Sequence, residues 1–317
     1  MPEYRKIRET RTLIEICKTP EIAAEVTRQP LRLGVDAAIL FADILLPLDP
    51  MGASFEFAKG EGPVIHEPIA RREQIDRLRV IDPEESLDYV LSAIRLLKRD
   101  LQVPLIGFAG APFTLASYLI EGGKSANFAR TKKLMFGAPE AWAALMTTLT
   151  EVVRRYLRAQ IAAGVDAVQL FDSWVGDLAP EDYVAYVQPY VRTILRDVEG
   201  TGVPVIHFGM GTATLLEAMR DAGGTVIGID FTTPLGEAWD RIGHDRAVQG
   251  NMDPCALLAT REVAVKHAQR ALDAAGGRPG HVFNLGHGIT PETPVDNVRA
   301  VVDHVHAATE ATATRPR

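Results

Sequence analysis

The sequence predicts an α/β protein built on a parallel sheet, and a (β/α)8 barrel is the architecture that suits it best. Short apolar runs rich in Val, Ile and Phe alternate with longer amphipathic runs from residue 37 almost to the end of the chain. No linker rich in Pro, Gly or Ser divides the chain, so we expect one domain over residues 1–317. The length of 317 residues accommodates a barrel of this kind, which typically needs roughly 250.

Seven strands are expected, each a short β-rich run between helical patterns. They are AAILFADI at 37–44, PLIGFAG at 104–110, AVQLFDS at 167–173, PVIHFGMG at 204–211, VIGIDF at 226–231, AVQGNMD at 247–253 and HVFNLGHGI at 281–289. A complete barrel has eight strands. We therefore expect the first strand to lie upstream of PEYR and to be missing from this chain.

The helical patterns between these runs have recognisable starts and stops. The segment SLDYVLSAIRLLKRDL at 86–101 places its apolar residues on one stripe. A long helix is expected to begin near Pro139 and to end at Gly164, and a shorter one to begin with Thr19 as its N-cap and Pro20 at its first position. The last residues, from about 309 to 317, are expected to form a disordered tail.

A doubly wound nucleotide-binding sheet is the competing architecture, and its fingerprints fail here. The stretch GMGTAT has Gly209 and Gly211 in place but Thr214 where the third glycine belongs. The stretch GGKS at 122–125 resembles the end of a P-loop, but the first glycine of that motif would fall at Tyr118. The barrel therefore remains the preferred fold.

Composition excludes several classes of function. The formal net charge of −7 argues against nucleic acid as a main partner, because proteins that bind the phosphate backbone carry a basic face. The richest apolar stretch, AAILFADILLPL, is interrupted by Asp43 and is too short to span a bilayer. The two cysteines, Cys17 and Cys255, cannot build a disulfide framework or a four-thiolate zinc site. We expect a cytoplasmic enzyme without a membrane partner.

Asp43 is the most informative residue at a predicted strand end, where barrel enzymes place their chemistry. Large apolar residues surround it in LFADILLP, and a buried carboxylate is costly without hydrogen-bond donors. Two hypotheses remain open from the residues themselves. Asp43 accepts backbone N–H groups at the strand end, which is slightly favoured, or it awaits a ligand that brings N–H groups or positive charge.

Other strand-end residues are weaker candidates. Tyr118 precedes the flexible stretch EGGK, although core packing is the ordinary role of such a tyrosine. Ser173 lacks a G-x-S-x-G elbow, so hydrogen bonding is favoured over nucleophilic chemistry. His287 is flanked by glycines and is the best functional candidate among the eight histidines. A metal site is not expected, because His207 is followed two positions later by Gly209 rather than by a cysteine.

Six motifs in consistent order resemble the uroporphyrinogen decarboxylase family over the whole chain. They are PEYRKIRE, FADILLP, GFAGAPFTLASYLIEGG, LFDSWVG, GNMDP and NLGHGI. The resemblance implies a distorted (β/α)8 barrel, usually a homodimer, and a cofactor-free carboxy-lyase. That activity converts the four acetates of uroporphyrinogen III to methyls and yields coproporphyrinogen III in heme biosynthesis. In the family a strand and a loop similar to MRQAGRY precede PEYR, so two arginine ligands are also expected to be missing.

The resemblance also implies roles for individual residues, and it moves the preference for Asp43 to the functional side. Asp43 would accept the pyrrole N–H groups and stabilise a cationic intermediate. Tyr118, Ser173 and His287 would contact substrate carboxylates or the reacting acetate. Arg8 would bind a carboxylate or deliver a proton. The residues expected to bind substrate are Arg5, Phe41, Phe171 and Ser173.

Two other functions remain possible on the sequence. A methyltransferase of the same superfamily would move a methyl group between a corrinoid and a thiol, but it would use a zinc-binding His-x-Cys pair where this chain has His207 and Gly209. A non-catalytic tetrapyrrole-binding protein would be favoured by the expected loss of the arginine loop.

Overall fold

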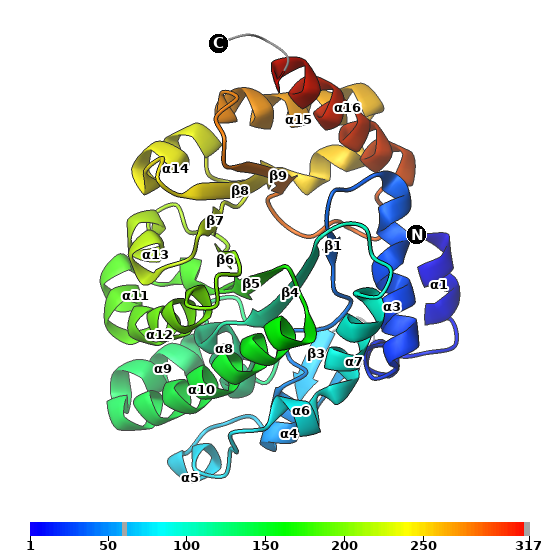
Figure 1. Ribbon diagram of the computed structural model, residues 1–317. Coiled ribbons are helices and arrows are strands. Elements are labelled where there is room, and N and C mark those ends of the chain that lie inside the picture. The colour runs from blue at the N-terminus through cyan, green and yellow to red at the C-terminus, as the bar shows by residue number, and fades with distance from the viewer. Residues whose placement is uncertain (59–61, 314–317) are drawn as a thin grey trace.

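A single curved sheet of parallel strands organises the protein. The structure is a computed structural model that describes residues 1–58 and 62–313. Within these ranges seven strands pair in the order β1-β4-β5-β6-β7-β8-β9 (Figure 1). All seven predicted positions are confirmed by β1 (Ala38–Ile39), β4 (Leu105–Gly110), β5 (Ala167–Phe171), β6 (Val205–Phe208), β7 (Val226–Gly228), β8 (Ala247–Met252) and β9 (His281–Leu285). A separate antiparallel hairpin joins β2 (Phe55–Ala58) to β3 (Gly62–Ile65).

The register places the carboxyl ends of neighbouring strands side by side. Gly110 of β4 lies opposite Phe171 of β5, which in turn lies opposite Phe208 of β6. Because all of these strands are parallel, the loops that follow them gather at one end of the sheet. Polar residues that follow separate strands in the sequence are thereby brought to a common face.

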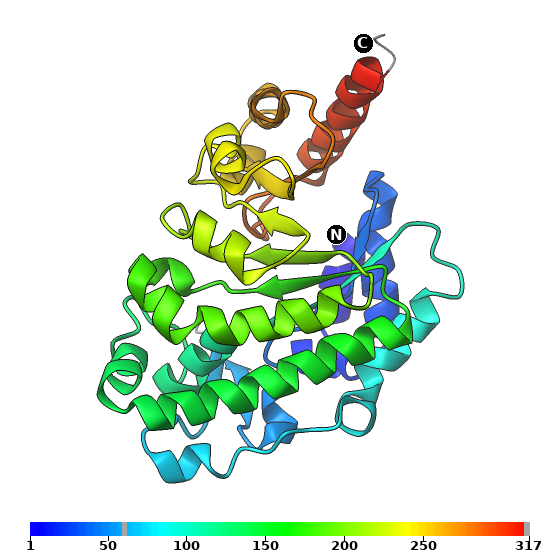
Figure 2. The same cartoon turned by 60° about the vertical axis from the view of Figure 1, so that its left-hand side comes forward.

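Helices cover the outer side of the sheet, as Figures 1 and 2 show, and the long green helix α10 is prominent in Figure 2. The helices of the first half are α1 (Pro2–Arg8), α2 (Leu13–Cys17), α3 (Pro20–Arg28), the 3₁₀ helix η1 (Gln29–Leu33), α4 (Leu48–Met51), α5 (Arg72–Ile75), α6 (Pro83–Ser86), α7 (Asp88–Leu97), α8 (Pro112–Glu121) and α9 (Ala129–Gly137). Those of the second half are α10 (Pro139–Ala163), η2 (Val175–Asp177), α11 (Pro180–Tyr186), α12 (Gln188–Glu199), α13 (Leu216–Ala222), α14 (Leu235–Ile242), η3 (Pro254–Leu258), α15 (Arg261–Ala275) and α16 (Val295–Ala313).

The predicted helix boundaries hold where the sequence carries a strong signal. Helix α10 begins at Pro139, and Gly164 ends it in a left-handed conformation with φ of 115°, which glycine adopts without steric cost. Thr19 is the N-cap of α3, although its hydroxyl donates back to the Glu15 carbonyl rather than capping the helix. The expected tail is corrected in part: α16 continues to Ala313, so residues 309–313 are helical, and residues 314–317 lie outside the described residues.

The core lies mainly between the sheet and its helices. The largest buried cluster joins residues of the first two thirds of the chain, including Trp142 and Tyr156 of α10. Smaller clusters lie around β7 and α14, with Trp239 at the centre, and between α15 and α16. All strands of the main sheet belong to one arc, and the single-domain expectation stays a prediction. No helix in the described part of the chain has both the length and the apolar character to cross a membrane.

The sheet is an open arc, because within the described residues β1 pairs only with β4 and β9 pairs only with β8. Large apolar side chains are exposed on both terminal strands: Ile39 of β1 is 53% exposed and Val282 of β9 is 46% exposed. The helical layer nevertheless connects the two ends, since His306 Nε2 of α16 lies 3.0 Å from Asp36 Oδ2, just before β1. The position between β9 and β1 is where an eighth barrel strand would pair.

Candidate functional site

A mainly apolar cavity of about 550 Å³ opens beside β1, at the carboxyl ends of β4 and β5. Asp43 is the only acidic or basic side chain among the described residues that line it. The lining comprises Met1, Tyr4, Val26, Thr27, Gln29, Pro30, Ile39, Leu40, Phe41, Ala42, Asp43, Ile44, Phe108 and Phe171. An isolated carboxylate in apolar surroundings is the group that most needs a ligand.

Asp43 follows β1 and is partly buried. Its Oδ1 accepts a hydrogen bond of 2.8 Å from the Leu45 backbone N–H, which is the structural role expected of it at a strand end. No described residue donates to Oδ2. Burial raises the pKa of the Asp43 carboxyl, and the Leu45 N–H opposes that change only in part. The carboxylate therefore has one backbone donor and a second oxygen free for a ligand.

Aromatic rings form a wall across three neighbouring strands. The rings of Phe108 and Phe171 lie 5.5 Å apart edge to face, and Phe171 lies 5.9 Å from Phe208. On the β1 side of the cavity, Tyr4 of α1 lies 5.5 Å from Phe41. The sequence predicted Phe41 and Phe171 but missed Phe108 and Tyr4. Alternation along PLIGFAG could have placed Phe108 on the inner face, and Tyr4 stands within the motif PEYR.

Tyr118 lies on α8, close to Asp43 but outside the cavity lining. Its ring packs at 6.1 Å against Trp174, which follows Ser173 after β5. Burial raises the pKa of the Tyr118 hydroxyl, and the negative charge of Asp43 raises it further, so the hydroxyl stays protonated at neutral pH. Ser173 is partly buried directly after the strand that carries Phe171. Tyr118 on α8 and Ser173 in the loop after β5 thus lie near Asp43 and Phe171, respectively, but outside the cavity lining.

Arg5 and Arg8 lie outside the cavity lining and donate hydrogen bonds to backbone carbonyl oxygens. Arg5 Nη2 donates to the Pro291 carbonyl at 2.6 Å, and Arg8 Nη1 donates to the Arg11 carbonyl at 2.6 Å. Arg8 is nevertheless near the site, because its charge lowers the pKa of Cys17, whereas burial and the charge of Asp43 raise that pKa to about 12. Each of these bonds uses one nitrogen of its guanidinium group, and neither arginine lines the cavity.

His287 is exposed on the loop that follows β9, and its Nδ1 lies 3.4 Å from the Gly288 carbonyl oxygen. This loop connects with α1 through the Arg5 bond to Pro291. The structure therefore brings Phe41, Asp43 and Phe171 together in one cavity. It places Tyr118 and Ser173 beside that cavity, and leaves His287, Arg5 and Arg8 at its rim or on the surface.

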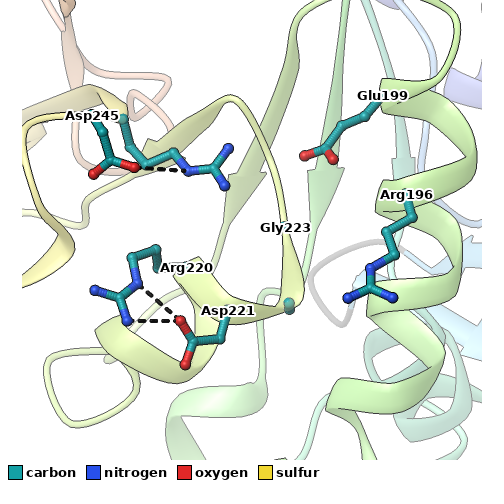
Figure 3. A pocket seen from close by; sticks show the side chains of 8 residues that line it. Arg196, Glu199, Arg220, Asp221, Gly223 and Asp245 are labelled. Atoms are coloured by element: carbon teal, nitrogen blue, oxygen red, sulfur yellow. Dashed lines mark hydrogen bonds and ion pairs between the residues drawn. The ribbon is translucent and has the colours of Figure 1, made fainter.

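A second hollow, of about 410 Å³, lies where α12 and α13 end and β8 is about to begin (Figure 3). Arg220 Nη2 contacts Asp221 at 2.8 Å, and Arg246 Nε lies 3.9 Å from Asp245. Glu199 accepts the Gly224 backbone N–H. Acids and arginines balance one another here, at the end of the sheet where barrels place residues that serve stability rather than catalysis.

Comparison with known proteins identifies the family. The family model described as "Uroporphyrinogen decarboxylase (URO-D)" matches residues 1–308. This chain belongs to the uroporphyrinogen decarboxylase family. It is 67% identical over 313 residues to a uroporphyrinogen decarboxylase from Sorangium cellulosum, a match that covers 98% of this chain and 90% of the relative. It is 56% identical over 309 residues to one from Carboxydothermus hydrogenoformans, covering 96% and 88%.

Solved structures with lower sequence identity agree on the fold. A methyltransferase from Methanosarcina mazei superimposes with a TM-score of 0.79 at 21% identity, covering 93% of this chain and 87% of that one. A B12-independent methionine synthase from Shewanella superimposes with a TM-score of 0.62 at 11% identity, covering 92% and 89%. At these identities the likeness concerns the fold alone. The architecture of this chain therefore also occurs in solved structures described as a methyltransferase and a methionine synthase.

Proposed function

We propose that this chain decarboxylates the four acetate side chains of uroporphyrinogen III to methyl groups, giving coproporphyrinogen III for heme biosynthesis. The observation that carries the proposal is Asp43, the one acidic side chain among the described residues of an apolar cavity, with one oxygen to which no described residue donates. The substrate offers what this carboxylate lacks, because the centre of its macrocycle presents four pyrrole N–H groups. Family membership and the names of the relatives support the same activity.

The reaction is redox-neutral and needs an electron sink rather than an oxidant. Protonation of a pyrrole ring makes a cation that accepts the electron pair released as the carbon–carboxyl bond breaks and CO₂ leaves. The exocyclic carbon then takes up a proton and becomes a methyl, and the ring loses the proton it had gained. Each cycle replaces one CH₂CO₂H group with CH₃. The substrate's own ring is the sink, so the proposal includes no cofactor.

Asp43 supplies charge where the cation develops. Its burial disfavours the ionised carboxylate in the free protein, and the pyrrole N–H donors and the cationic ring both favour that form. A negative charge fixed in a dry cavity acts more strongly on a cation than one in water does. Asp43 therefore contributes most in the cationic intermediate, which is the state that catalysis must stabilise.

The remaining roles follow from position. Phe41, Phe108 and Phe171 pack against the apolar macrocycle and keep water from the reacting ring. Tyr118, with its hydroxyl protonated, and Ser173 donate hydrogen bonds to substrate carboxylates beside the cavity. His287, Arg8 and Arg5 serve the outer carboxylates from the rim, where guanidinium groups can bind carboxylates in bidentate geometry.

The position of His207 counts against the methyltransferase alternative. A zinc-activated thiol would require this side chain in the cavity with a cysteine nearby. In the structure the His207 side chain is fully buried, lies 3.6 Å from Asp172 and does not line the cavity. Gly209 occupies the position of the required cysteine.

Anaerobic turnover of uroporphyrinogen III, with products separated by their number of carboxylates, tests the proposal. Heptacarboxylate to pentacarboxylate intermediates followed by coproporphyrinogen support it. No product from a folded chain that binds the substrate would instead favour a tetrapyrrole-binding protein. Methyl transfer that depends on added zinc would favour the methyltransferase.

Two finer expectations belong to the same proposal, namely a cytoplasmic location and a homodimeric state. Light scattering of the purified protein tests the second of these directly. A mass near twice the 34.6 kDa of the chain supports the dimer, and a mass near 34.6 kDa contradicts it.

A further inference from the structure

Asp172 and His207 form a buried polar pair behind the aromatic wall. Asp172 follows β5 directly, and His207 lies on the adjoining strand β6. His207 Nε2 is 3.6 Å from Asp172 Oδ2, and both side chains are completely buried. Burial raises the pKa of the Asp172 carboxyl, while His207 lowers it. Burying two ionisable groups lowers the stability of the fold unless their mutual attraction offsets the lost hydration.

The surroundings give this pair no other partner. Within the described chain, both carboxylate oxygens of Asp172 and both ring nitrogens of His207 have no hydrogen-bond partner, since the pair distance of 3.6 Å is longer than a hydrogen bond. The nearby Tyr183 of α11 is also fully buried with a hydroxyl that has no partner among the described residues. Burial raises the pKa of that hydroxyl, and the charge of Asp172 raises it further. Buried polar groups in native proteins are almost always satisfied. The fold therefore holds the two side chains next to each other without a hydrogen bond from any described residue.

Strand alternation explains what the pair does for the cavity. Phe171 points inward to the cavity, whereas Leu170 before it is fully buried in the core beneath the helices. His207 likewise alternates with the inward ring of Phe208, which packs against Phe171. Asp172 and His207 thus lie on the helix-facing side, immediately next to residues that shape the cavity.

The backbone segments around the pair are closely packed at two glycines. A Cβ atom on Gly176, in the loop after β5, would come within 2.1 Å of the Met210 carbonyl oxygen in the loop after β6. A Cβ on Gly209 would come within 3.0 Å of the Asp172 carbonyl oxygen. The two loops are in direct backbone contact, so the Asp172–His207 pair lies at the base of an interlocked structure.

We propose that Asp172 and His207 are positioning residues: the Asp172 carboxylate lies 3.6 Å from His207 Nε2 on the outer side of the sheet, and this polar contact fixes the inward placement of Phe171 and Ser173. Neither residue touches the substrate. The proposal deepens the decarboxylase function and rests on it for the kinetic consequence. Its structural consequence, the placement of Phe171, is independent of any activity.

The test combines two variants that break the pair with one that preserves it. Asp172→Ala removes the carboxylate, and His207→Leu removes the imidazole. Asp172→Asn keeps a side-chain oxygen at this position. Trp239→Phe is the matched control, because it removes a buried hydrogen bond, 2.8 Å from Nε1 to the Arg246 carbonyl, far from the cavity along the chain and the sheet.

The first readout is ¹⁹F NMR of protein labelled with fluorophenylalanine, with the Phe171 signal assigned by its loss in Phe171→Leu. We expect this signal to move or broaden in whichever breaking variants fold, to remain near its wild-type position in Asp172→Asn, and to be unchanged in Trp239→Phe. An unchanged Phe171 signal in a folded breaking variant would overturn the proposal. Loss of folding in both breaking variants while Asp172→Asn also moves the Phe171 signal would overturn it as well.

The second readout is steady-state decarboxylation. We expect the breaking variants to raise KM by about tenfold while kcat changes by less than about twofold, since uniform substrate binding is lost. Asp172→Asn should retain most of the wild-type KM. A shifted Phe171 signal with unchanged KM would refute the link to substrate placement. Absence of turnover in the wild type would refute the proposed function alone, and the NMR readout would still decide the positioning role.

Discussion

The two ends of the sheet differ in whether their acidic side chains have a basic side chain nearby. At the end where β8 begins, the Arg220 guanidinium lies 2.8 Å from the Asp221 carboxylate. The charges of the acids and arginines that line the hollow in Figure 3 sum to zero. At the other end Asp43 has one backbone donor and no arginine, lysine or histidine side chain among the described residues of the cavity lining. An acid left without a counter-charge in apolar surroundings lowers stability. Its presence here is expected of a functional site rather than of a structural one.

Asp43→Asn should give the largest effect and should move activity and stability in opposite directions. We expect kcat to fall by about 10²–10³, the usual loss when one preorganised electrostatic group is removed. The melting temperature at pH 7 should rise. A carboxyl whose pKa is raised by folding binds more protons in the native state, so its ionisation destabilises the fold as pH rises through that range. The neutral amide avoids this loss.

Thermal melts between pH 4 and pH 8 measure the second effect, and the gain from Asp43→Asn should grow toward the upper end of that range. Asp221→Asn, in the balanced hollow, is the matched control. It should leave kcat unchanged and should not raise the melting temperature. Full activity in Asp43→Asn would remove the basis for treating the two ends differently.

An added eighth strand should have the next largest effect. A strand and loop placed ahead of Met1, about thirty residues as in one βα unit, would pair with β9 and β1 and cover Ile39 and Val282. Burying these two side chains should add about 3 kcal/mol to the free energy of unfolding. Thermal and urea unfolding provide the measurement.

A Gly/Ser extension of equal length is the control for chain length alone. It should leave the melting temperature where it is. Equal stability of the strand-bearing and Gly/Ser forms would mean that the helical contacts of α16 and α1 already complete the barrel without an eighth strand.

Phe171→Leu should change substrate binding more than stability. The ring contacts Phe108 and Phe208 edge to face, and an aromatic pair contributes about 0.5–1.5 kcal/mol beyond its buried area. We expect KM for uroporphyrinogen to rise by about two- to tenfold with a small loss of melting temperature. Phe136→Leu is the control, because this ring on α9 is 50% exposed and pairs edge to face with Tyr186, away from the cavity lining. It should also lower the melting temperature slightly but should leave KM unchanged. Equal KM values for the two variants would argue against the aromatic wall.

Arg220→Gln should give the smallest effect. Its ion pair with Asp221 is largely exposed, and such pairs contribute about 0–1 kcal/mol. We expect a slight loss of melting temperature at low salt, which should vanish near about 1 M NaCl as the charges are screened. Activity should be unaffected. A large loss of turnover would show that the hollow in Figure 3 takes part in function.

The strands were predictable because parallel strands buried on both faces are nearly continuous apolar runs. Strand β6, with the sequence VIHF, is buried at all four positions, and its residues other than His207 are apolar. Helix ends were predictable where Pro139 and Gly164 impose geometry. The tail was not, since Ala and Thr in TEATA permit a helix that only the preceding turns of α16 nucleate.

The site was predictable where chemistry and strand position coincide, as at Asp43 and Phe171. It was not predictable where it depends on partners distant in sequence. The sequence analysis considered His207 only as a metal ligand and did not expect a metal site there. The structure places it 3.6 Å from Asp172, a neighbour that strand register brings to it. The bond from Arg5 to the Pro291 carbonyl joins residues 286 positions apart, and no local pattern encodes it.

The brevity of β1 has a consequence for dynamics. This strand delivers Asp43, yet it has two register pairs with β4, against five between β4 and β5. Amides such as that of Leu40, bonded to the Ile106 carbonyl at 3.0 Å, should exchange with solvent through local opening while the central strands stay closed. A ligand that bonds to Asp43 would restrain this edge first. Slower deuterium uptake at residues 38–45 would then report occupancy before any product has formed.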